Sequence, residues 1–364
     1  MEAIRMKIVL VGPQYPDSFA KCISVTLMEM GHDVFTIDEH EILPSTHLPT
    51  SIKMHDVFKI KTWENILIKG SPGFEKWVYG SLCKRIENFG PNLIITITAT
   101  IPPQAISRLK KETDSKIVLW FPDSLSNYGR EYIFASDFDA LFFKDPYIVE
   151  FCKDKINKKA YYLPECCQPR WHRRIKLTEE ERNFYGCDLT AAGNLYYYRA
   201  LIIEHLSHYN YNIKLWGPPI PRWLNTPIRS LHQNRYVAEV EKAKAFNAAK
   251  IVLNTIHPTE IMGVNARTFE IAGCGGFQIC DLKPELPELF TLDQEIIAFH
   301  NLNDLKEKVA YYLAHPEEME KISDRAYKRA HGEHTYAHRM RRMLRILGYE
   351  NEKTTGNHKE RWQE

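Results

Sequence analysis

The sequence predicts an α/β protein built from two Rossmann-like, doubly wound domains. Short apolar runs alternate with longer amphipathic segments along most of the chain, which is the pattern of parallel strands joined by helical crossovers. The 364 residues are enough for two domains that each bury a core of their own. A segment with two prolines at 164–174 interrupts the alternation and separates the two predicted halves.

The first half opens with a strand–helix–strand unit, predicted at 7–10, 19–30 and 32–37. The glycine fingerprint of dinucleotide-binding loops is missing after the first strand, because Gly12 is followed by Pro13 and Gln14. This argues against NAD or FAD in this half. The remaining elements are predicted as helices at 73–89 and 103–111 and strands at 91–98, 116–121, 139–143 and 160–163, with an irregular segment at 43–73.

The second half repeats the alternation. Its elements are predicted as strands at 188–192, 212–216, 250–255 and 277–280 and helices at 197–209, 238–248 and 265–272. The resulting domain plan is an N-terminal domain at 1–170, a linker at 171–186, a C-terminal domain at 187–336, a helix at 337–350 that packs back on the N-terminal domain, and a polar, disordered tail at 351–364.

Composition limits the environment and the partners. A net charge of +2 gives no reason to expect nucleic acid. The chain opens on a strand without a signal-peptide pattern and has no apolar run of about 18 residues, so we expect a cytoplasmic protein. None of the eight cysteines forms a C-x-x-C pair. The basic amphipathic segment 338–349 either packs its apolar face on the core or makes a peripheral membrane contact.

The stretch 257–281 carries the strongest chemical signal. After a predicted buried strand, a loop leads into a short helix on which Arg267 and Glu270 lie within one turn. A helix that begins at the carboxyl end of a strand offers unpaired N–H groups to a diphosphate. The carboxylate of Glu270 suits the paired hydroxyls of a sugar. The alternative is a surface helix with an ordinary exposed ion pair.

The residues N-x-R-x-F-E followed by C-G-G-F resemble the donor-site motif of GT-B glycosyltransferases, specifically the CgeB-like (spore maturation protein) branch of the family 1/4 group. The resemblance is clearest from 188 to 336. It implies the GT-B architecture, in which two Rossmann-like domains face each other across a cleft, and it implies that Glu270 binds the nucleotide ribose. The better-known motif has two glutamates separated by seven residues, whereas Glu260 and Glu270 are separated by nine.

The resemblance and the loop positions together give a set of donor-binding candidates. Gly193 permits close approach to the diphosphate and Arg199 neutralises its charge, unless this is a plain βα turn. Trp216 either forms part of the nucleobase pocket or packs under a loop. The full set of predicted donor-binding residues is Gly193, Asn194, Arg199, Trp216, Gly217, Tyr236, Asn265, Arg267, Glu270 and Gly275.

On the acceptor side, Asp123 directly follows a buried strand and is the predicted catalytic residue. It either hydrogen-bonds the transferred sugar or acts as general base, and the alternative is an ordinary turn aspartate. The first βα loop, with Tyr15 and Asp17, gives weaker candidates for acceptor contacts. Asp137 and Asp139 spell D-x-D, but they precede a strand rather than follow one, so no metal site is predicted.

The predicted function is therefore a cytoplasmic glycosyltransferase of polysaccharide biosynthesis. It moves a sugar from a UDP-, GDP- or dTDP-linked donor to a hydroxyl of a glycan, glycolipid or protein acceptor, without a metal ion. Resemblance to the family 4 group favours retention of configuration. The alternatives are a nucleotide-sugar epimerase of the same architecture and a non-catalytic member that binds a glycan or a partner.

Overall fold

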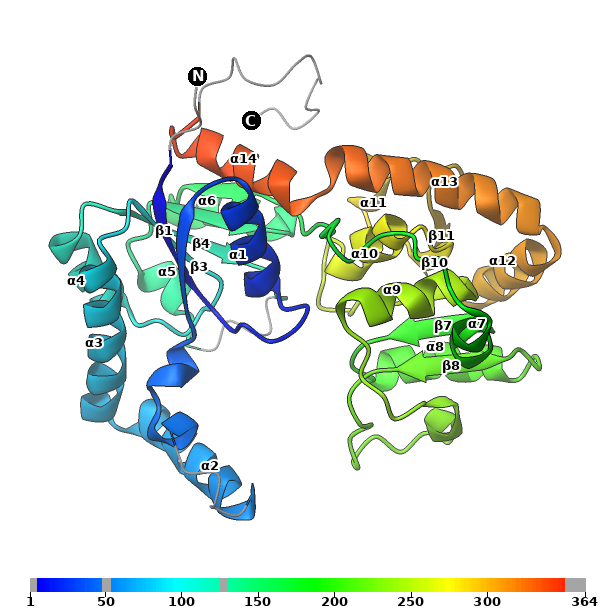
Figure 1. Cartoon of the computed structure of the whole chain (residues 1–364), viewed down its shortest axis with the longest axis horizontal. Coiled ribbons are helices and arrows are strands. Elements are labelled where there is room, and N and C mark those ends of the chain that lie inside the picture. The colour runs from blue at the N-terminus through cyan, green and yellow to red at the C-terminus, as the bar shows by residue number, and fades with distance from the viewer. Residues whose placement is uncertain (1–4, 48–53, 125–129, 351–364) are drawn as a thin grey trace.

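The structure is a computed structural model that describes residues 5–47, 54–124 and 130–350. The tail predicted at 351–364 lies outside these residues. Figure 1 shows two α/β domains side by side, with the carboxyl-terminal helices running along one side of both. The predicted fold class, two Rossmann-like domains in the GT-B arrangement, is confirmed.

The first domain holds a six-stranded sheet in the order β2-β1-β3-β4-β5-β6, with every neighbouring pair parallel. Its strands are almost wholly apolar because helices cover both faces. Their bounds are β1 Lys7–Val11, β2 Asp33–Ile37, β3 Leu93–Thr96, β4 Lys116–Phe121, β5 Ala140–Phe143 and β6 Ala160–Tyr162. The helices of this domain are α1 Phe19–Glu29, α2 Met54–Gly70, α3 Pro72–Phe89, α4 Pro103–Glu112, α5 Tyr132–Ala135 and α6 Pro146–Ile156.

Helices α2, α5 and α6 of this domain have no counterpart among the predicted ranges. The segment expected to be irregular contains α2, preceded by two short 3-10 helices at Glu39–Ile42 and Pro44–His47. Figure 1 shows α2 at the outer end of the first domain, beside α3 and far from α14.

The second domain holds a five-stranded parallel sheet in the order β11-β10-β9-β7-β8. Its strands are β7 Cys187–Ala192, β8 Ile213–Trp216, β9 Ala249–Asn254, β10 Gln278–Asp281 and β11 Ile297–Phe299. The helices are α7 Glu179–Tyr185, α8 Tyr197–Ser207, α9 Glu239–Ala248, α10 Ala266–Cys274, α11 Leu286–Leu289, α12 Leu302–Ala314 and α13 Pro316–Glu333, with a 3-10 helix at Pro227–Leu231.

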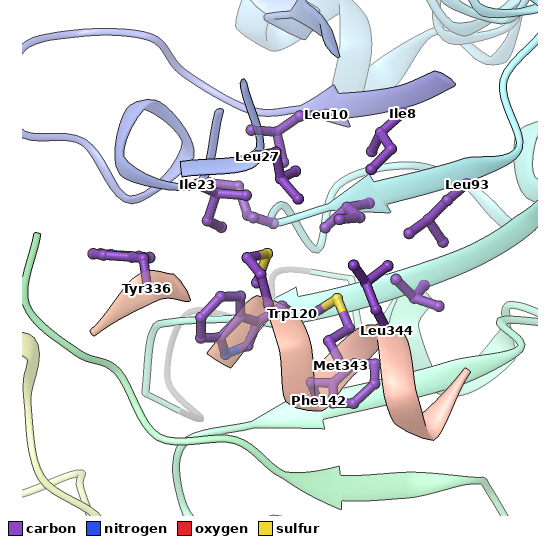
Figure 2. Packing of buried hydrophobic residues seen from close by; sticks show 14 of the residues in the cluster. Ile8, Leu10, Ile23, Leu27, Leu93, Trp120, Phe142, Tyr336, Met343 and Leu344 are labelled. Atoms are coloured by element: carbon purple, nitrogen blue, oxygen red, sulfur yellow. The ribbon is translucent and has the colours of Figure 1, made fainter. Parts of the chain in front are cut away.

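The last helix, α14 (Tyr336–Ile346), returns to the first domain. Its buried Met340, Met343 and Leu344 lie in the same hydrophobic cluster as Trp120. Figure 2 shows Met343 and Leu344 beside Trp120. Of the two interpretations of this basic amphipathic segment, the structure shows the one in which its apolar face packs on the core. Among the described residues, no helix is long and apolar enough to cross a membrane.

Strand order determines where each domain binds ligands. In the first sheet, β2 lies on one side of β1 and β3 on the other. In the second sheet, β8 and β9 lie on the two sides of β7 in the same way. Such switch points open a crevice beyond the carboxyl ends of the strands. The loops after β1 and after β7 are therefore the natural ligand-binding loops. Ion pairs join Asp17 and Lys21 of the first domain to Lys242 and Glu239 on α9 of the second domain.

Candidate active site

The loop after β7 brings two backbone segments unusually close together. Gly193 has a φ of 112°, in the region that favours glycine. A side chain at Gly217, after the neighbouring strand β8, would lie 2.4 Å from the carbonyl oxygen of Gly193. Gly193 N–H also donates to Trp216 O at 2.9 Å. Both glycines are therefore needed to form this edge of the site, whether or not they touch a ligand.

Arg199, on the first turn of α8, is buried behind this loop. Its guanidinium donates to Thr255 Oγ1 at 2.8 Å and to the carbonyl oxygen of Asn194 at 2.5 Å. Burial, together with the positive charge of Arg267, lowers the pKa of Arg199 to about 9. Two like charges close together, one of them buried, are unfavourable unless an anion lies between them.

Arg267, on the first turn of α10, approaches the same loop from the other side. A side chain at Gly193 would lie 2.6 Å from Arg267 Nη2 and 3.4 Å from Arg199 Nη1. Among residues 5–47, 54–124 and 130–350, no carboxylate lies within ion-pair distance of either guanidinium, and Arg267 makes no hydrogen bond. The structure thus brings together Gly193, Arg199 and Arg267 around a position that is electrostatically prepared for an anion.

Glu270 lies one turn further along α10 and is not paired with Arg267. Its Oε2 accepts from Lys242 Nζ at 2.7 Å, and the same ammonium forms an ion pair with Asp17 of the first domain. Asp17 has a φ of 65°, which is rare for a non-glycine residue. Lys21 and Glu239 make a second ion pair across the same boundary at 2.7 Å.

The charges in this bridge stabilise one another. Burial alone would raise the pKa of Asp17, but the charge of Lys242 and the hydrogen bonding of His172 hold it below its ordinary value. Burial would likewise lower the pKa of Lys242, but Glu270 and Asp17 raise it above its ordinary value. Asp17 also accepts from Trp171 Nε1 at 3.1 Å. Asp17 and Lys242 are therefore both charged at neutral pH.

Tyr236 is half exposed close to this bridge. Burial and the nearby Asp17 carboxylate raise the pKa of its hydroxyl, so it remains a neutral hydrogen-bond donor. Tyr15, from the first βα loop, is exposed to a similar extent. Burial raises the pKa of its hydroxyl, and the charges of Asp17 and Lys242 act on that pKa as well. Both phenol rings are thus accessible at the cleft, where a ring or sugar face can pack on them.

Asp123 is exposed at the carboxyl end of β4, as its position in the sequence predicts. It lines a cavity large enough for about one water molecule, together with Lys144 and Glu260. Lys144 Nζ lies 2.8 Å from Glu260 Oε1 and 3.4 Å from Glu165 Oε2, and all three side chains are buried. Glu260 therefore crosses from the second domain to pair with the first.

Three predicted donor residues have structural roles in this arrangement. Trp216 is only 1% exposed, and its Nε1 donates to Thr190 Oγ1 at 3.0 Å, so packing rather than a nucleobase pocket is what the structure shows. Asn265 caps α10 by accepting from Thr268 N at 3.1 Å. Gly275 ends α10 on the side away from its N-terminus, where a side chain would meet Arg174 Nε at 2.5 Å.

Sequence reasoning missed Lys242, His172 and Lys144. Lys242 left a detectable signal, because it falls on the same stripe of α9 as the buried Ala245 and Phe246. A lysine on an apolar stripe must be paired with an acid, which points to a buried site. His172 lies in an irregular segment, and Lys144 follows a strand, so neither position departs from an ordinary pattern.

Comparisons with known proteins agree with this fold. Residues 199–345 match a family described as glycosyl transferase-like. Spore protein CgeB of Bacillus subtilis (strain 168) is 24% identical over 259 residues, which are 67% of this chain and 79% of that protein. Sucrose-phosphate synthase of Thermosynechococcus elongatus superposes with a TM-score of 0.67 at 11% identity, covering 94% of this chain and 99% of that one. Anabaena HepE, in complex with UDP and glucose, gives a TM-score of 0.63 at 9% identity, covering 94% and 100%.

The fold is that of the GT-B glycosyltransferases, and the family match over 199–345 supports a glycosyltransferase. Within that class the chain is similar to spore protein CgeB, in agreement with the resemblance noted in its sequence. These findings do not favour an epimerase.

Proposed function

We propose that the protein transfers a sugar from a UDP-linked donor to a hydroxyl acceptor, with retention of configuration and without a divalent metal ion. The choice of uridine rests on HepE, which binds UDP and is similar in fold. Retention rests on the resemblance to the family 4 group. The acceptor is a glycan, glycolipid or protein that presents a free hydroxyl.

The observation that carries the proposal is the pair of guanidinium groups at Gly193. Arg199 and Arg267 both point at this loop without a carboxylate partner among the described residues. The adjacent helix α8 begins at Tyr197 with no side-chain cap, so its first N–H groups add to the positive potential. A donor diphosphate placed here is stabilised more strongly as charge develops on the leaving group, which is what accelerates transfer.

Glu270 is placed to hold the ribose of the same donor. Its Oε2 is occupied by Lys242, and its Oε1 accepts no hydrogen bond from the described residues. His172 Nε2 lies 3.9 Å from Oε1. We propose that a ribose hydroxyl donates to Oε1 while Lys242 holds the carboxylate in place.

Metal independence is supported by the same lysine. One ligand atom each from Asp17, His172 and Glu270 lies within 4.8 Å of the other two, an arrangement that suits a cation. Lys242 Nζ contacts both carboxylates and so provides the positive charge itself. The D-x-D residues Asp137 and Asp139 instead both pair with Lys110, at the opposite edge of the sheet from the cleft.

The proposed reaction needs few protein groups. The bond between the anomeric carbon and the diphosphate oxygen breaks, and the acceptor oxygen bonds to the same face of that carbon. The proton of the acceptor hydroxyl passes to the departing diphosphate, whose negative charge Arg199 and Arg267 stabilise. We assign to Asp123 a hydrogen bond to the sugar or the incoming hydroxyl, which orients the reactants.

Thermal-shift titration tests the donor assignment. We expect UDP to raise the melting temperature, and the shift to persist in EDTA, because a ligand that binds only the folded state stabilises it by mass action. GDP, dTDP, CMP and NAD serve as comparisons. Product analysis with UDP-glucose and a hydroxyl acceptor then tests transfer. The absence of a shift with every nucleoside diphosphate would overturn the proposal in favour of a non-catalytic member.

A further inference from the structure

Helix α2 turns an apolar face to solvent. Trp63 is 63% exposed, Ile66 51% and Leu67 42%. Their spacing of three and four residues places them on one side of the helix. The opposite side packs inward through Ile68, which contacts the buried cluster of the first domain. The apolar residues of α2 thus form two stripes, of which only one is used by the fold.

Between residues 59 and 70, the exposed charges beside this stripe are positive. Lys59, Lys61 and Lys69 are exposed on α2. The acidic Glu64 is 4% exposed and turned inward, where its Oε1 accepts from Ser45 N at 2.7 Å. Between residues 59 and 70, every exposed charged side chain is therefore a lysine.

The start of the neighbouring helix α3 continues the pattern. Trp77 is 49% exposed and Lys76 is exposed beside it. The acidic Glu75 is already neutralised by Arg130, whose Nη1 lies 3.0 Å from Glu75 Oε1. We call the exposed apolar and lysine side chains of these two helices the α2 surface; they are Lys59, Lys61, Trp63, Ile66, Leu67, Lys69, Lys76 and Trp77.

We propose that the α2 surface docks the protein on an anionic membrane surface. Tryptophan is favoured at the boundary between water and lipid, because its ring is apolar and its N–H finds a polar partner there. Lysines bury their apolar stems while the ammonium groups reach the lipid phosphates, and each contributes about 1 kcal/mol near an anionic leaflet. A second copy of the chain is a poor occupant, since it would bring two sets of lysines together.

This placement differs from the one that the sequence alone suggested. The basic segment near the C-terminus packs its apolar residues into the core, so it has none to insert into lipid. Figure 1 shows α2 and α14 at opposite ends of the first domain. Docking through α2 therefore leaves α14 undisturbed. The proposal does not depend on the identity of the sugar donor.

Vesicle sedimentation with the full chain tests the proposal. We expect binding to vesicles of phosphatidylcholine with about one third phosphatidylglycerol, little binding to pure phosphatidylcholine, and weaker binding at high salt. Changing Lys59, Lys61 and Lys69 to glutamine should weaken binding at least about tenfold. The matched control changes three exposed lysines of the same domain, Lys153, Lys155 and Lys159, to glutamine and should leave binding unchanged.

A second pair of variants tests the apolar contribution. Trp63→Ser should weaken vesicle binding several-fold at constant charge, whereas Trp223→Ser, at a residue that is 65% exposed in the second domain, should not. Melting temperatures should match the wild type, because the altered side chains are exposed. Equal binding to neutral and anionic vesicles, no binding to either, or equal losses in test and control variants would overturn the proposal. Loss of UDP binding with intact vesicle binding would count only against the proposed donor site.

Discussion

Lys242 Nζ lies 2.7 Å from Glu270 Oε2, and through its ion pair with Asp17 it also joins the two domains. One ammonium group therefore holds the proposed ribose-binding carboxylate and closes the cleft. The carboxylate is fixed before a donor arrives, and its orientation depends on the position of the other domain. Donor affinity and domain closure are thus coupled through a single side chain.

Lys242→Met is expected to be strongly destabilising. The methionine fills the space but leaves the carboxylates of Asp17 and Glu270 close together, largely buried and without a counter-charge. Removing one partner of a buried ion pair costs about 3–5 kcal/mol. The free energy of unfolding, measured in urea, should fall by that order.

Lys21→Met is the matched control for this change. The ion pair between Lys21 and Glu239 crosses the same boundary, but both side chains are about 30% exposed. The loss of this pair should cost less than about 1 kcal/mol. Equal losses in the two variants would show that Lys242 is no more than a surface lysine.

All strands except β11 were predicted from the sequence, because buried parallel strands read as short apolar runs between polar turns. The edge strand β11, Ile297–Phe299, is only three residues long and was missed. Helix α2 was missed for another reason. Its exposed Trp63 and Ile66 lie opposite its buried side, so apolar residues occur on both sides and the helical period is obscured. The spacing of apolar residues predicts secondary structure where those residues are buried. It misleads where apolar residues face solvent.

The site was predictable only in part. The spacing of Arg267 and Glu270 on one helix is a local property, and so is the glycine after the first strand of the second domain. The partner of Glu270 comes from another helix, and the next member of the bridge, Asp17, comes from the other domain. Such pairs depend on how the sheets face each other, which local spacing does not reveal.

Glu270→Gln is expected to weaken UDP binding about 5- to 150-fold, which corresponds to about 1–3 kcal/mol. The neutral amide cannot accept a charge-assisted hydrogen bond from the ribose, although it has the same size. Isothermal titration with UDP gives the affinity directly. Glu239→Gln alters another carboxylate at the domain boundary and should bind UDP like the wild type. An unchanged affinity in Glu270→Gln would refute the assignment.

Arg267→Ala is expected to lower UDP affinity without lowering the stability of the unliganded protein. In the unliganded protein, Arg267 faces the buried Arg199 without an acidic partner among the described residues, so its removal relieves a repulsion. We expect an equal or higher melting temperature without ligand and a loss of about 1.5–3 kcal/mol in UDP binding. Uridine, which lacks the diphosphate, should bind both proteins equally.

The exposed Arg222 provides the control for charge alone. Arg222→Ala removes one positive charge outside the cluster at Gly193 and should leave UDP affinity within about twofold. A similar loss of UDP affinity in both variants would show that the overall charge of the protein, rather than the cluster, attracts the nucleotide.

Gly193→Ala is expected to damage both the fold and the site. The φ of 112° is strained for alanine, and the added methyl group would lie 2.6 Å from Arg267 Nη2. A cost of about 1–3 kcal/mol in stability is expected from the backbone alone. UDP affinity should fall as well, because Arg267 must move. In contrast, Gly332→Ala, on α13 with open space around it, should stabilise the protein by about 0.5–1 kcal/mol.

The ion cluster of Lys144, Glu165 and Glu260 should make stability depend on pH near neutrality. Burial raises the pKa of Glu165 to about 7. The charge of Lys144 lowers this pKa, but Lys144 is shared with Glu260 and offsets only part of the effect of burial. The folded protein then holds a proton that the unfolded chain releases near pH 4.5. The stabilisation from this proton is complete below pH 4.5 and is lost as the pH rises through 7.

Glu165→Gln is the direct test of this effect, since glutamine mimics the protonated acid at every pH. The free energy of unfolding of the wild type should fall by on the order of 1–3 kcal/mol between pH 5 and pH 8, and the variant should lose less over the same range. At pH 8 the variant should therefore be the more stable protein. Parallel stability curves for the two proteins would mean that Glu165 is ionised throughout and that Lys144 neutralises both glutamates.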